Sequence, residues 1–244
     1  MEKYEIIKMS EFEDWNWWFV SRRAMMLKMI PKNAKTVFEI GAGTGKNLEV
    51  LKNSGFSVEG LDVSQVCVDI AKKKGIRLHK IGIENFDFRK KYDLILMMDF
   101  LEHIENDGKA LEKAAGAIAK NGHLLVTVPA FQLLFGVHDK VHHHFRRYSM
   151  RELERLLESA GFEIEFISYW NALLFVPSAF VKIINKNTKK NWKKRQESNL
   201  TKLPGFFNSA LITALKLENF LVGRKARLPF GTSIVCLAKA RPQK

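Results

Sequence analysis

The stretch EIGAGTGKN, residues 39–47, combines an acidic residue with three glycines at alternate positions. Glycine loops let a ligand approach the backbone closely, and many of them hold phosphate or nucleotide. A phosphate loop of the NTPase type needs four residues before its Gly-Lys pair, then Ser or Thr. Here three residues separate Gly41 from Gly45-Lys46, and Asn47 follows. A dinucleotide fingerprint needs glycine where Lys46 stands, so the pattern that remains is acidic-x-G-x-G-x-G.

A second acidic residue, Asp62, ends the apolar segment FSVEGLD about twenty positions after this loop. A carboxylate at the end of such a strand can accept hydrogen bonds from both hydroxyls of a ribose. Asp62 is not needed as a helix cap, because Ser64 is a good N-cap for the helix expected next. The two segments together therefore favour a nucleoside ligand over a glycine turn that merely joins a strand to a helix.

The loop from Glu39 to Gly45 resembles the first motif of the class I S-adenosylmethionine-dependent methyltransferases. Many small-molecule methyltransferases of this class also carry a strand that ends in Asp, followed by Leu-Glu-His-Ile, and YDLILMMDFLEHIEND, residues 92–107, is similar to it. The resemblance covers about residues 36–170 and returns at 231–240. It implies a methyltransferase with S-adenosylmethionine as cofactor, on a doubly wound α/β fold with a seven-stranded, mostly parallel sheet.

This resemblance assigns each part of the cofactor to a part of the chain. Glu39 would hold the ammonium group, directly or through water, and Asp62 would hold the ribose. The family usually has an aspartate for the adenine amino group, but Gly82 stands there, which leaves the amide of Ile83 and the side chain of Glu84. The implied cofactor-binding residues are Glu39, Gly41, Ala42, Gly43, Gly45, Asp62, Val63, Ile83, Glu84, Met98, Asp99 and Leu101.

Methyl transfer is an in-line displacement on an already activated methyl group, so the protein must place the acceptor atom and exclude water. A hydroxyl or protonated amine acceptor also benefits from a general base. We expect His103 to be this base, with Glu102 orienting it, because both follow the fourth strand. The alternative is a structural histidine that caps the following turn.

Histidines also cluster in the segment HDKVHHHFRRYS, residues 138–149. Histidine and aspartate are good metal ligands, but adjacent histidines in a loop cannot all face one ion, so we expect no metal here. The segment resembles one methyltransferase subgroup, which implies binding of the acceptor; its arginines suit a carboxylate or phosphate, or they pair with Glu152 and Glu154. The implied acceptor-binding residues are His138, His144, Arg146, Arg147, Tyr148 and, from WNWWFVSRR near the N-terminus, Trp18.

The remaining pattern alternates strands with helices, which predicts a parallel sheet covered on both faces. Residues 1–35 are expected to form a helical lid, residues 36–170 with 231–244 the cofactor-binding core, and residues 171–230 a helical insertion. The strands are predicted at 36–41, 56–62, 76–81, 92–98, 123–128, 162–170 and 232–240, and helices at about 45–54, 64–74, 107–119 and 150–160.

The insertion combines apolar segments with a lysine-rich run, KNTKKNWKKRQESNLTK, residues 186–202. Within the insertion, five apolar residues are predicted near one face of a helix: Phe207, Leu211, Ala214, Leu217 and Leu221. An apolar helix beside a basic run can lie in the interface of an anionic membrane. The alternatives are a cap over the substrate pocket or a homodimer interface.

The charge and cysteine content of the chain limit the classes of partner that we expect. The net charge of +14 favours nucleic acid, anionic lipid or an acidic substrate, and the two cysteines, Cys67 and Cys236, fit a reduced cytoplasmic protein with peripheral membrane contact as an option. Nucleic acid is disfavoured, because Asp99-Phe100-Leu101-Glu102 replaces the usual Asn/Asp-Pro-Pro-aromatic motif and neither cysteine suits cytosine methylation. We therefore expect O- or N-methylation of a small or lipid-linked acceptor, with an RNA methyltransferase and a non-catalytic cofactor-binding domain as alternatives.

Overall fold

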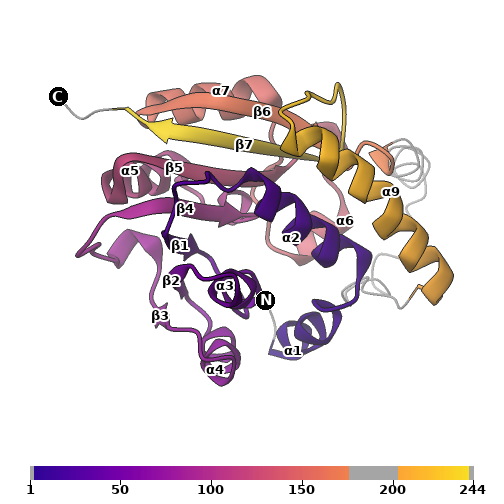
Figure 1. The fold of residues 1–244 in the computed structure, drawn as a ribbon, viewed down its shortest axis with the longest axis horizontal. Coiled ribbons are helices and arrows are strands. Elements are labelled where there is room, and N and C mark those ends of the chain that lie inside the picture. Colours follow the sequence, from indigo (N-terminus) through magenta and orange to yellow (C-terminus); the bar gives the residue numbers. More distant parts are fainter. Residues whose placement is uncertain (1–2, 176–202, 242–244) are drawn as a thin grey trace.

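The computed structural model describes residues 3–175 and 203–241, which form a sheet with helices on both faces (Figure 1). The sheet has seven strands in the order β3-β2-β1-β4-β5-β7-β6. Strands β1 to β5 run parallel, while β7 is antiparallel to both β5 and β6. This is the doubly wound, mostly parallel sheet that the sequence predicts. The order reverses beside β1, where ligands bind in such sheets.

The strands form where the sequence predicts them, with small shifts at their ends. The shortest is β3, which keeps three residues of the six predicted. The strands are β1 (Thr36–Ile40), β2 (Ser57–Asp62), β3 (Leu78–Lys80), β4 (Tyr92–Met98), β5 (Ile118–Pro129), β6 (Phe162–Trp170) and β7 (Ser233–Ala240).

The helices cover the two faces of the sheet. Cores of buried apolar side chains lie on both faces because β4 is apolar on both sides: Ile95 and Met97 join one core, Leu94 and Leu96 the other. The α-helices between or beside the strands are α1 (Lys3–Phe12), α2 (Trp17–Met29), α3 (Lys46–Asn53), α4 (Gln65–Lys73), α5 (Asp107–Ala117), α6 (Val137–Val141), α7 (Met150–Ser159) and α9 (Gly205–Gly223).

Serine caps fix the first turns of two of these helices. Ser64, the cap expected from the sequence, accepts a hydrogen bond from the amide of Cys67 at the start of α4. Ser149 and Glu152 form the reciprocal capping box of α7. Both helices start at the residue after the capping serine.

The end of α5 differs from the prediction. The helix was expected to continue to about residue 119, but it ends at Ala117 and β5 begins at once. Tyr92 pairs with Ile118 and Leu94 with His123, so the residues between form a bulge. Asn121 adopts a positive φ of 66° there, and a Cβ on Gly122 would lie 2.9 Å from a backbone oxygen. The Asn-Gly pair therefore shapes a bulge inside the strand instead of stopping the helix.

The N-terminal segment forms two helices, and α2 packs beside α9 from the insertion (Figure 1). Asn16 caps α2 by accepting a hydrogen bond from the amide of Trp18 at 3.0 Å. Trp18 packs on Trp170 at the end of β6, with 5.1 Å between the ring centroids. These contacts fix the start of α2 beside the carboxyl end of β6, and further along the helix Met25 and Met26 pack into the core on one face of the sheet.

The helix α9 buries three polar side chains beside Leu215 and Val222, and it leaves several large apolar side chains exposed. Its buried residues include Asn208, Glu218 and Asn219, whereas Phe207 and Leu217 of the predicted apolar face are 59% and 64% exposed. Asn219 donates to the carbonyl of Ser21 and accepts from the indole of Trp170, both at 2.8 Å. These hydrogen bonds turn the polar side inward, because buried backbone and indole groups need partners. Among the residues that the structure describes, no helix is long and apolar enough to cross a membrane.

Candidate active site

A cavity of about 1040 Å³ opens at the carboxyl ends of the strands. Its walls come from the loop after β1, the end of β2 and the turns after β3 and β4. The two N-terminal helices and the histidine-rich segment before α7, residues 138–149 and here called the histidine loop, complete them. The sequence-predicted residues that line it are Trp18, Glu39, Gly41, Ala42, Gly43, Asp62, Val63, Ile83, Glu84, Met98, Asp99, Glu102, His103, His144 and Arg147.

The glycine loop has the backbone that its sequence requires. Gly41 has a φ of +71°, and a Cβ at that position would collide with the ring of Phe100. Any other residue would thus be strained and would push the turn after β4 away from the loop. The close approach of Gly41 to Phe100 brings the β1 and β4 sides of the cavity together.

Glu39 lies at the bottom of the loop and is 1% exposed. Its Oε1 accepts a hydrogen bond from Asn47 at 2.6 Å, while Oε2 has no hydrogen-bond partner among the described residues. Burial raises the pKa of Glu39 to about 8, against the hydrogen bond from Asn47. A buried carboxyl oxygen without a partner is rare, and an ammonium group fits it.

Asp62 stands at the end of β2 with its carboxylate fixed by the backbone. Oδ2 accepts from the amide of Gly43 at 2.9 Å, and Oδ1 accepts from the amide of Ser64 at 2.8 Å. Burial raises the pKa of Asp62, and these hydrogen bonds oppose the rise. Since each carboxylate oxygen can accept two hydrogen bonds, the fixed Asp62 retains capacity for two ribose hydroxyls.

The short turn after β3, which the sequence analysis assigned to adenine, forms one wall of the cavity. Ile83 is buried, and Gly82 and Glu84 line the wall. The carboxylate of Glu84 folds back over Gly82 and fills the place that a side chain at position 82 would take. The side chain of Glu84 therefore stands where the family usually has an aspartate.

The end of β4 carries a charged pair that was not predicted. Asp99 has a φ of +54° and forms an ion pair with Arg22 from α2. The hydroxyl of Thr127 donates to Asp99 at 3.0 Å. A non-glycine residue in the left-handed region is uncommon, and here it aims the carboxylate at the N-terminal helix. Arg22 thereby fastens α2 across the cavity.

The turn after β4 places Glu102 and His103 on the cavity wall. Glu102 is 1% exposed, and burial, reinforced by the charge of Asp99, raises its pKa well above the usual range. Burial and the neighbouring His144 lower the pKa of His103 to about 4. His103 is therefore a neutral imidazole at pH 7, with less affinity for a proton than an exposed histidine has.

The histidine loop contacts this turn directly. The amide of Phe145 donates to the carbonyl of Glu102 at 2.8 Å, which brings His144 to a ring-centroid distance of 4.6 Å from His103. Asp139 is fully buried and lies 3.1 Å from Nδ1 of His144 and 2.7 Å from Nε of Arg147. Burial opposes ionisation of Asp139, but these two hydrogen bonds outweigh it and hold its pKa below the usual range.

Other predicted residues lie elsewhere. Gly45 caps α3, and Leu101 is fully buried in the core. Arg146 donates to Asp107 and to the carbonyl of Glu105, and Tyr148 donates to Asp107 at 2.8 Å, so both anchor the loop on α5. The side chain of His138 lies outside the described part of the structure.

The N-terminal segment supplies contacts that the sequence analysis missed. The hydroxyl of Thr44 donates to Glu13 at 2.7 Å, and Lys74 reaches the same carboxylate at 3.4 Å. Glu13 is 6% exposed and lines the cavity. These contacts tie the α1–α2 connection to the glycine loop. For Arg22, which the sequence analysis also missed, one signal was available: its spacing from Trp18 places both residues on one side of α2.

Comparison with known proteins gives the family. Residues 18–166 match the family model described as "Methyltransferase domain". A ubiquinone biosynthesis O-methyltransferase from Bradyrhizobium diazoefficiens is 31% identical over 97 residues, which cover 37% of this chain and 38% of the relative. A second, from Hydrogenovibrio crunogenus, is 26% identical over 148 residues, covering 52% and 61%. The chain thus matches less than two thirds of the length of these two relatives.

Solved structures show the same fold. A SAM-dependent methyltransferase from Thermotoga maritima superposes with a TM-score of 0.63 at 18% identity and covers 98% of both chains. The chain belongs to the methyltransferase-domain family, and its fold is that of this S-adenosylmethionine-dependent methyltransferase. The unpartnered oxygen of Glu39 and the cradle at Gly41 and Gly43 fit this cofactor.

Proposed function

We propose that this enzyme methylates an oxygen or nitrogen of a small lipophilic or lipid-linked acceptor. The observation that carries the proposal is the continuity of the cavity. It runs from Gly43 and Asp62, at the cofactor end, to Leu174 and Leu203, which the insertion contributes. An acceptor that enters past the insertion would therefore move along apolar side chains of the cavity wall to reach the methyl group.

The cofactor end assigns a partner to each polar part of S-adenosylmethionine. Asp62 accepts the ribose hydroxyls, Glu39 accepts the ammonium group, and Ile83 with Glu84 meets the adenine. Arg22 would be the cation for the carboxylate of the cofactor, because it lines the cavity. It would then exchange its present partner, Asp99, for that carboxylate. The bound cofactor supplies an activated methyl group, so the remaining work of the chain is placement and exclusion of water.

The acceptor end consists of Glu102, His103, His144, Arg147 and Trp18. A neutral His103 can take a proton from a hydroxyl or an ammonium group, and the buried Glu102 beside it limits how far the imidazole moves. Arg147 is held by Asp139 and can still face a polar group of the acceptor. The N-terminal helices close the cavity above these groups.

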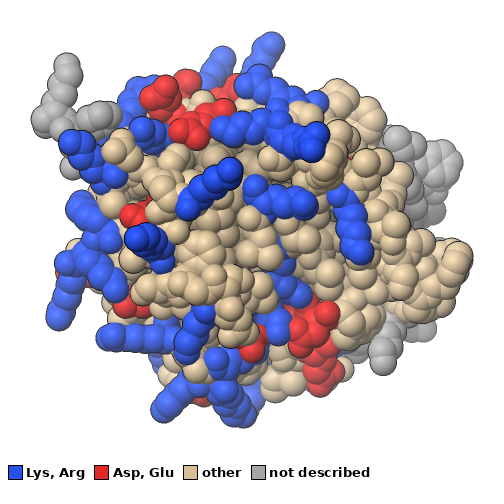
Figure 2. Space-filling view, viewed as in Figure 1, with Lys and Arg blue, Asp and Glu red and all other residues tan. Residues whose placement is uncertain are grey.

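The outer side of α9 supports a lipid-linked acceptor. Phe206 and Phe207 are 80% and 59% exposed, and the lower end of α9, at the right of Figure 2, shows no charged side chain, while basic side chains are spread over the rest of this face. The sequence just before α9, residues 186–202, has seven Lys and Arg and one acidic residue. Apolar side chains flanked by cations suit the interface of an anionic membrane. Pairing of two chains through α9 is the alternative.

A screen with radiolabelled methyl donor tests the proposal. The acceptors are polyprenyl-linked sugars, quinone precursors, small acids and RNA, and the Asp62→Ala variant serves as the control for enzyme-dependent labelling. We expect label in a product that extracts into organic solvent. Label confined to a small acid would contradict the lipophilic acceptor, and label in RNA together with salt-dependent RNA binding would support the alternative of an RNA methyltransferase.

A further inference from the structure

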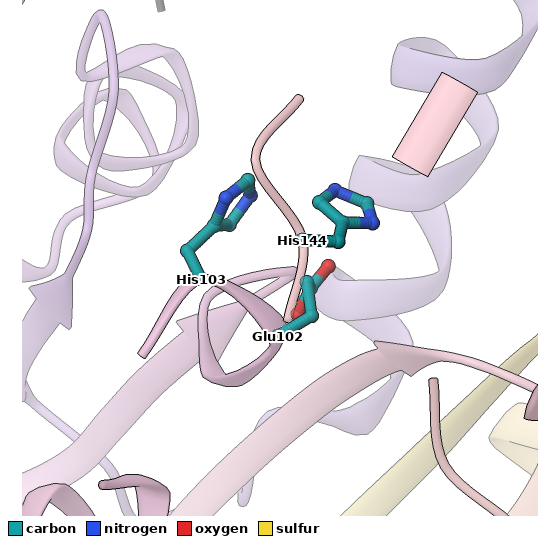
Figure 3. Close-up of side chains that lie close together, drawn as sticks. All are labelled: Glu102, His103 and His144. Carbon is teal, nitrogen blue, oxygen red and sulfur yellow. The ribbon is translucent and has the colours of Figure 1, made fainter. Parts of the chain in front are cut away.

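Three side chains around the acceptor end form a cluster that methyl transfer alone does not explain. Glu102, His103 and His144 each offer one ligand atom, and these atoms all lie within 4.8 Å of one another. Figure 3 shows that they come from two segments, the turn after β4 and the loop before α7, and lie around one point. The hydrogen bond from Phe145 to the carbonyl of Glu102 fixes the two segments together.

Glu102 is the unusual member of this cluster. Its side chain is buried, and Oε2 has no hydrogen-bond partner in the part of the chain that the structure describes. The nearest cations are already matched, because Arg22 pairs with Asp99 and Arg147 pairs with Asp139 at 2.7 Å. A cation placed at Oε2 would supply the partner that this buried carboxyl group lacks.

The environment of His144 points the same way. Its Nδ1 lies 3.1 Å from Oδ1 of the buried Asp139. A carboxylate behind one ring nitrogen fixes the tautomer and the ring orientation, and this is the usual arrangement of histidines that bind metal through the other nitrogen. Two imidazoles and one carboxylate are also a ligand set of catalytic zinc sites, which leave one position open.

We propose that Glu102, His103 and His144 bind a divalent transition metal ion, with its open position facing the cavity. No metal was expected from the sequence, because adjacent histidines of one loop cannot all face one ion. The structure needs one histidine from that loop, since the other two ligands come from the turn after β4. Tetrahedral zinc holds its ligand atoms about 3.3 Å apart, so the side chains draw together when the ion binds. With the ion bound, His103 would be a ligand and not the general base, and the ion would instead help an acceptor hydroxyl to lose its proton.

Zinc binding to metal-free protein tests this site without cofactor or acceptor. The probe is Zn²⁺ alone, followed by calorimetry and by metal analysis after gel filtration. We expect one tightly bound ion per chain, and at least about a hundredfold weaker binding in Glu102→Gln and in His144→Ala, because loss of a ligand costs more than loss of its supporting partner. Glu102→Gln keeps the shape of the side chain, so it separates loss of metal from loss of folding.

The matched control is His143→Ala, which removes an exposed histidine that also lines the cavity. It should bind zinc as the unmodified protein does. Absence of tight zinc binding, or zinc binding that survives both Glu102→Gln and His144→Ala, would overturn the site. Cofactor affinity is measured separately in the presence of a chelator, so that failure of the metal site and failure of the proposed methyl transfer are distinguishable.

Discussion

Asp62 is the residue whose removal most directly tests the cofactor site. Replacement by alanine deletes the carboxylate that we assign to both ribose hydroxyls, and hydrogen bonds to a charged group contribute about 1.5–3 kcal/mol each. Calorimetry should therefore show the affinity for S-adenosylmethionine falling by about 30-fold or more.

The control for this variant is Asp69→Ala. Asp69 lies in α4, on the exposed surface, and pairs with Gln65. It should bind the cofactor normally. Equal affinity of the Asp62→Ala and Asp69→Ala variants would remove Asp62 from the site, provided that both unfold at similar temperatures.

Glu39 predicts a link between cofactor binding and protons. Its pKa is raised to about 8 by burial, so it is protonated in the free enzyme at pH 6.5. The arriving ammonium group favours the ionised form and lowers this pKa. Binding at pH 6.5 should thus release close to one proton, seen as a binding enthalpy that depends on the ionisation enthalpy of the buffer. Glu39→Gln should bind more weakly and release none; no release from the unmodified protein would contradict an ammonium contact.

Single residues show what the sequence alone could locate. Glu39, Asp62 and Asp99 lie at or just after the carboxyl ends of parallel strands, and such strands end at one edge of the sheet, so their neighbourhood was predictable. Arg22 and His144 were not placed in the same way. Their positions depend on how α2 and the histidine loop pack against the sheet, and periodicity within a segment does not report the packing of that segment on another.

At the scale of elements, α9 is held by buried polar contacts as well as by the buried Leu215 and Val222. Asn219 is 1% exposed and bonds both Ser21 and Trp170. Alanine there leaves the buried indole N–H of Trp170 unpaired, at a cost of about 1–3 kcal/mol, while the carbonyl of Ser21 lies within α2 and keeps its helical hydrogen bond. Urea unfolding of Asn219→Ala should therefore show a loss of about 1–3 kcal/mol.

Leu217→Ala is the matched control on the same helix. Leu217 is 64% exposed, and exposed substitutions usually change the free energy of unfolding by less than about 0.5 kcal/mol. If Leu217→Ala destabilised the protein as much as Asn219→Ala, the outer side of α9 would be packed against something, as in a dimer.

The elements also show why local patterns fail at particular places. Asn121-Gly122 is a helix-stop signal by its sequence, and the pairing of β5 with β4 turned it into a bulge. In α9 the apolar positions were identified from the sequence, but the pattern did not show which side of the helix faces the protein. Hydrogen bonds fix that orientation: Asn208 and Asn219 bond α2, and Glu218 bonds the segment after β6. Hydrogen bonds to distant segments are invisible to a pattern within one helix.

At the scale of the whole molecule, the positive charge and the outer side of α9 predict membrane binding. The protein should co-sediment with vesicles that contain anionic lipid, and binding should weaken as salt screens the charges. Substitution of Phe206 and Phe207 by serine should reduce binding about tenfold or more, because each buried phenylalanine contributes about 1.5–3 kcal/mol. Glutamine at Lys189, Lys190, Lys193 and Lys194 should remove most of the salt dependence.

Leu133→Ser is the control for this experiment, since Leu133 is 74% exposed and lies in the turn after β5 and not in α9. It should leave vesicle binding unchanged. A protein that does not sediment with anionic vesicles at low salt would have no membrane contact, and its acceptor would be a soluble molecule.

The position of β7 determines how this protein must be made. The strand lies between β5 and β6 although it follows both in the chain. While the ribosome produces the chain, β5 therefore presents an open edge, and β6 waits for the strand that joins it to the sheet. Exposed edges pair readily with other chains, so the interval between synthesis of residues 170 and 233 is the period in which a growing chain most needs a chaperone.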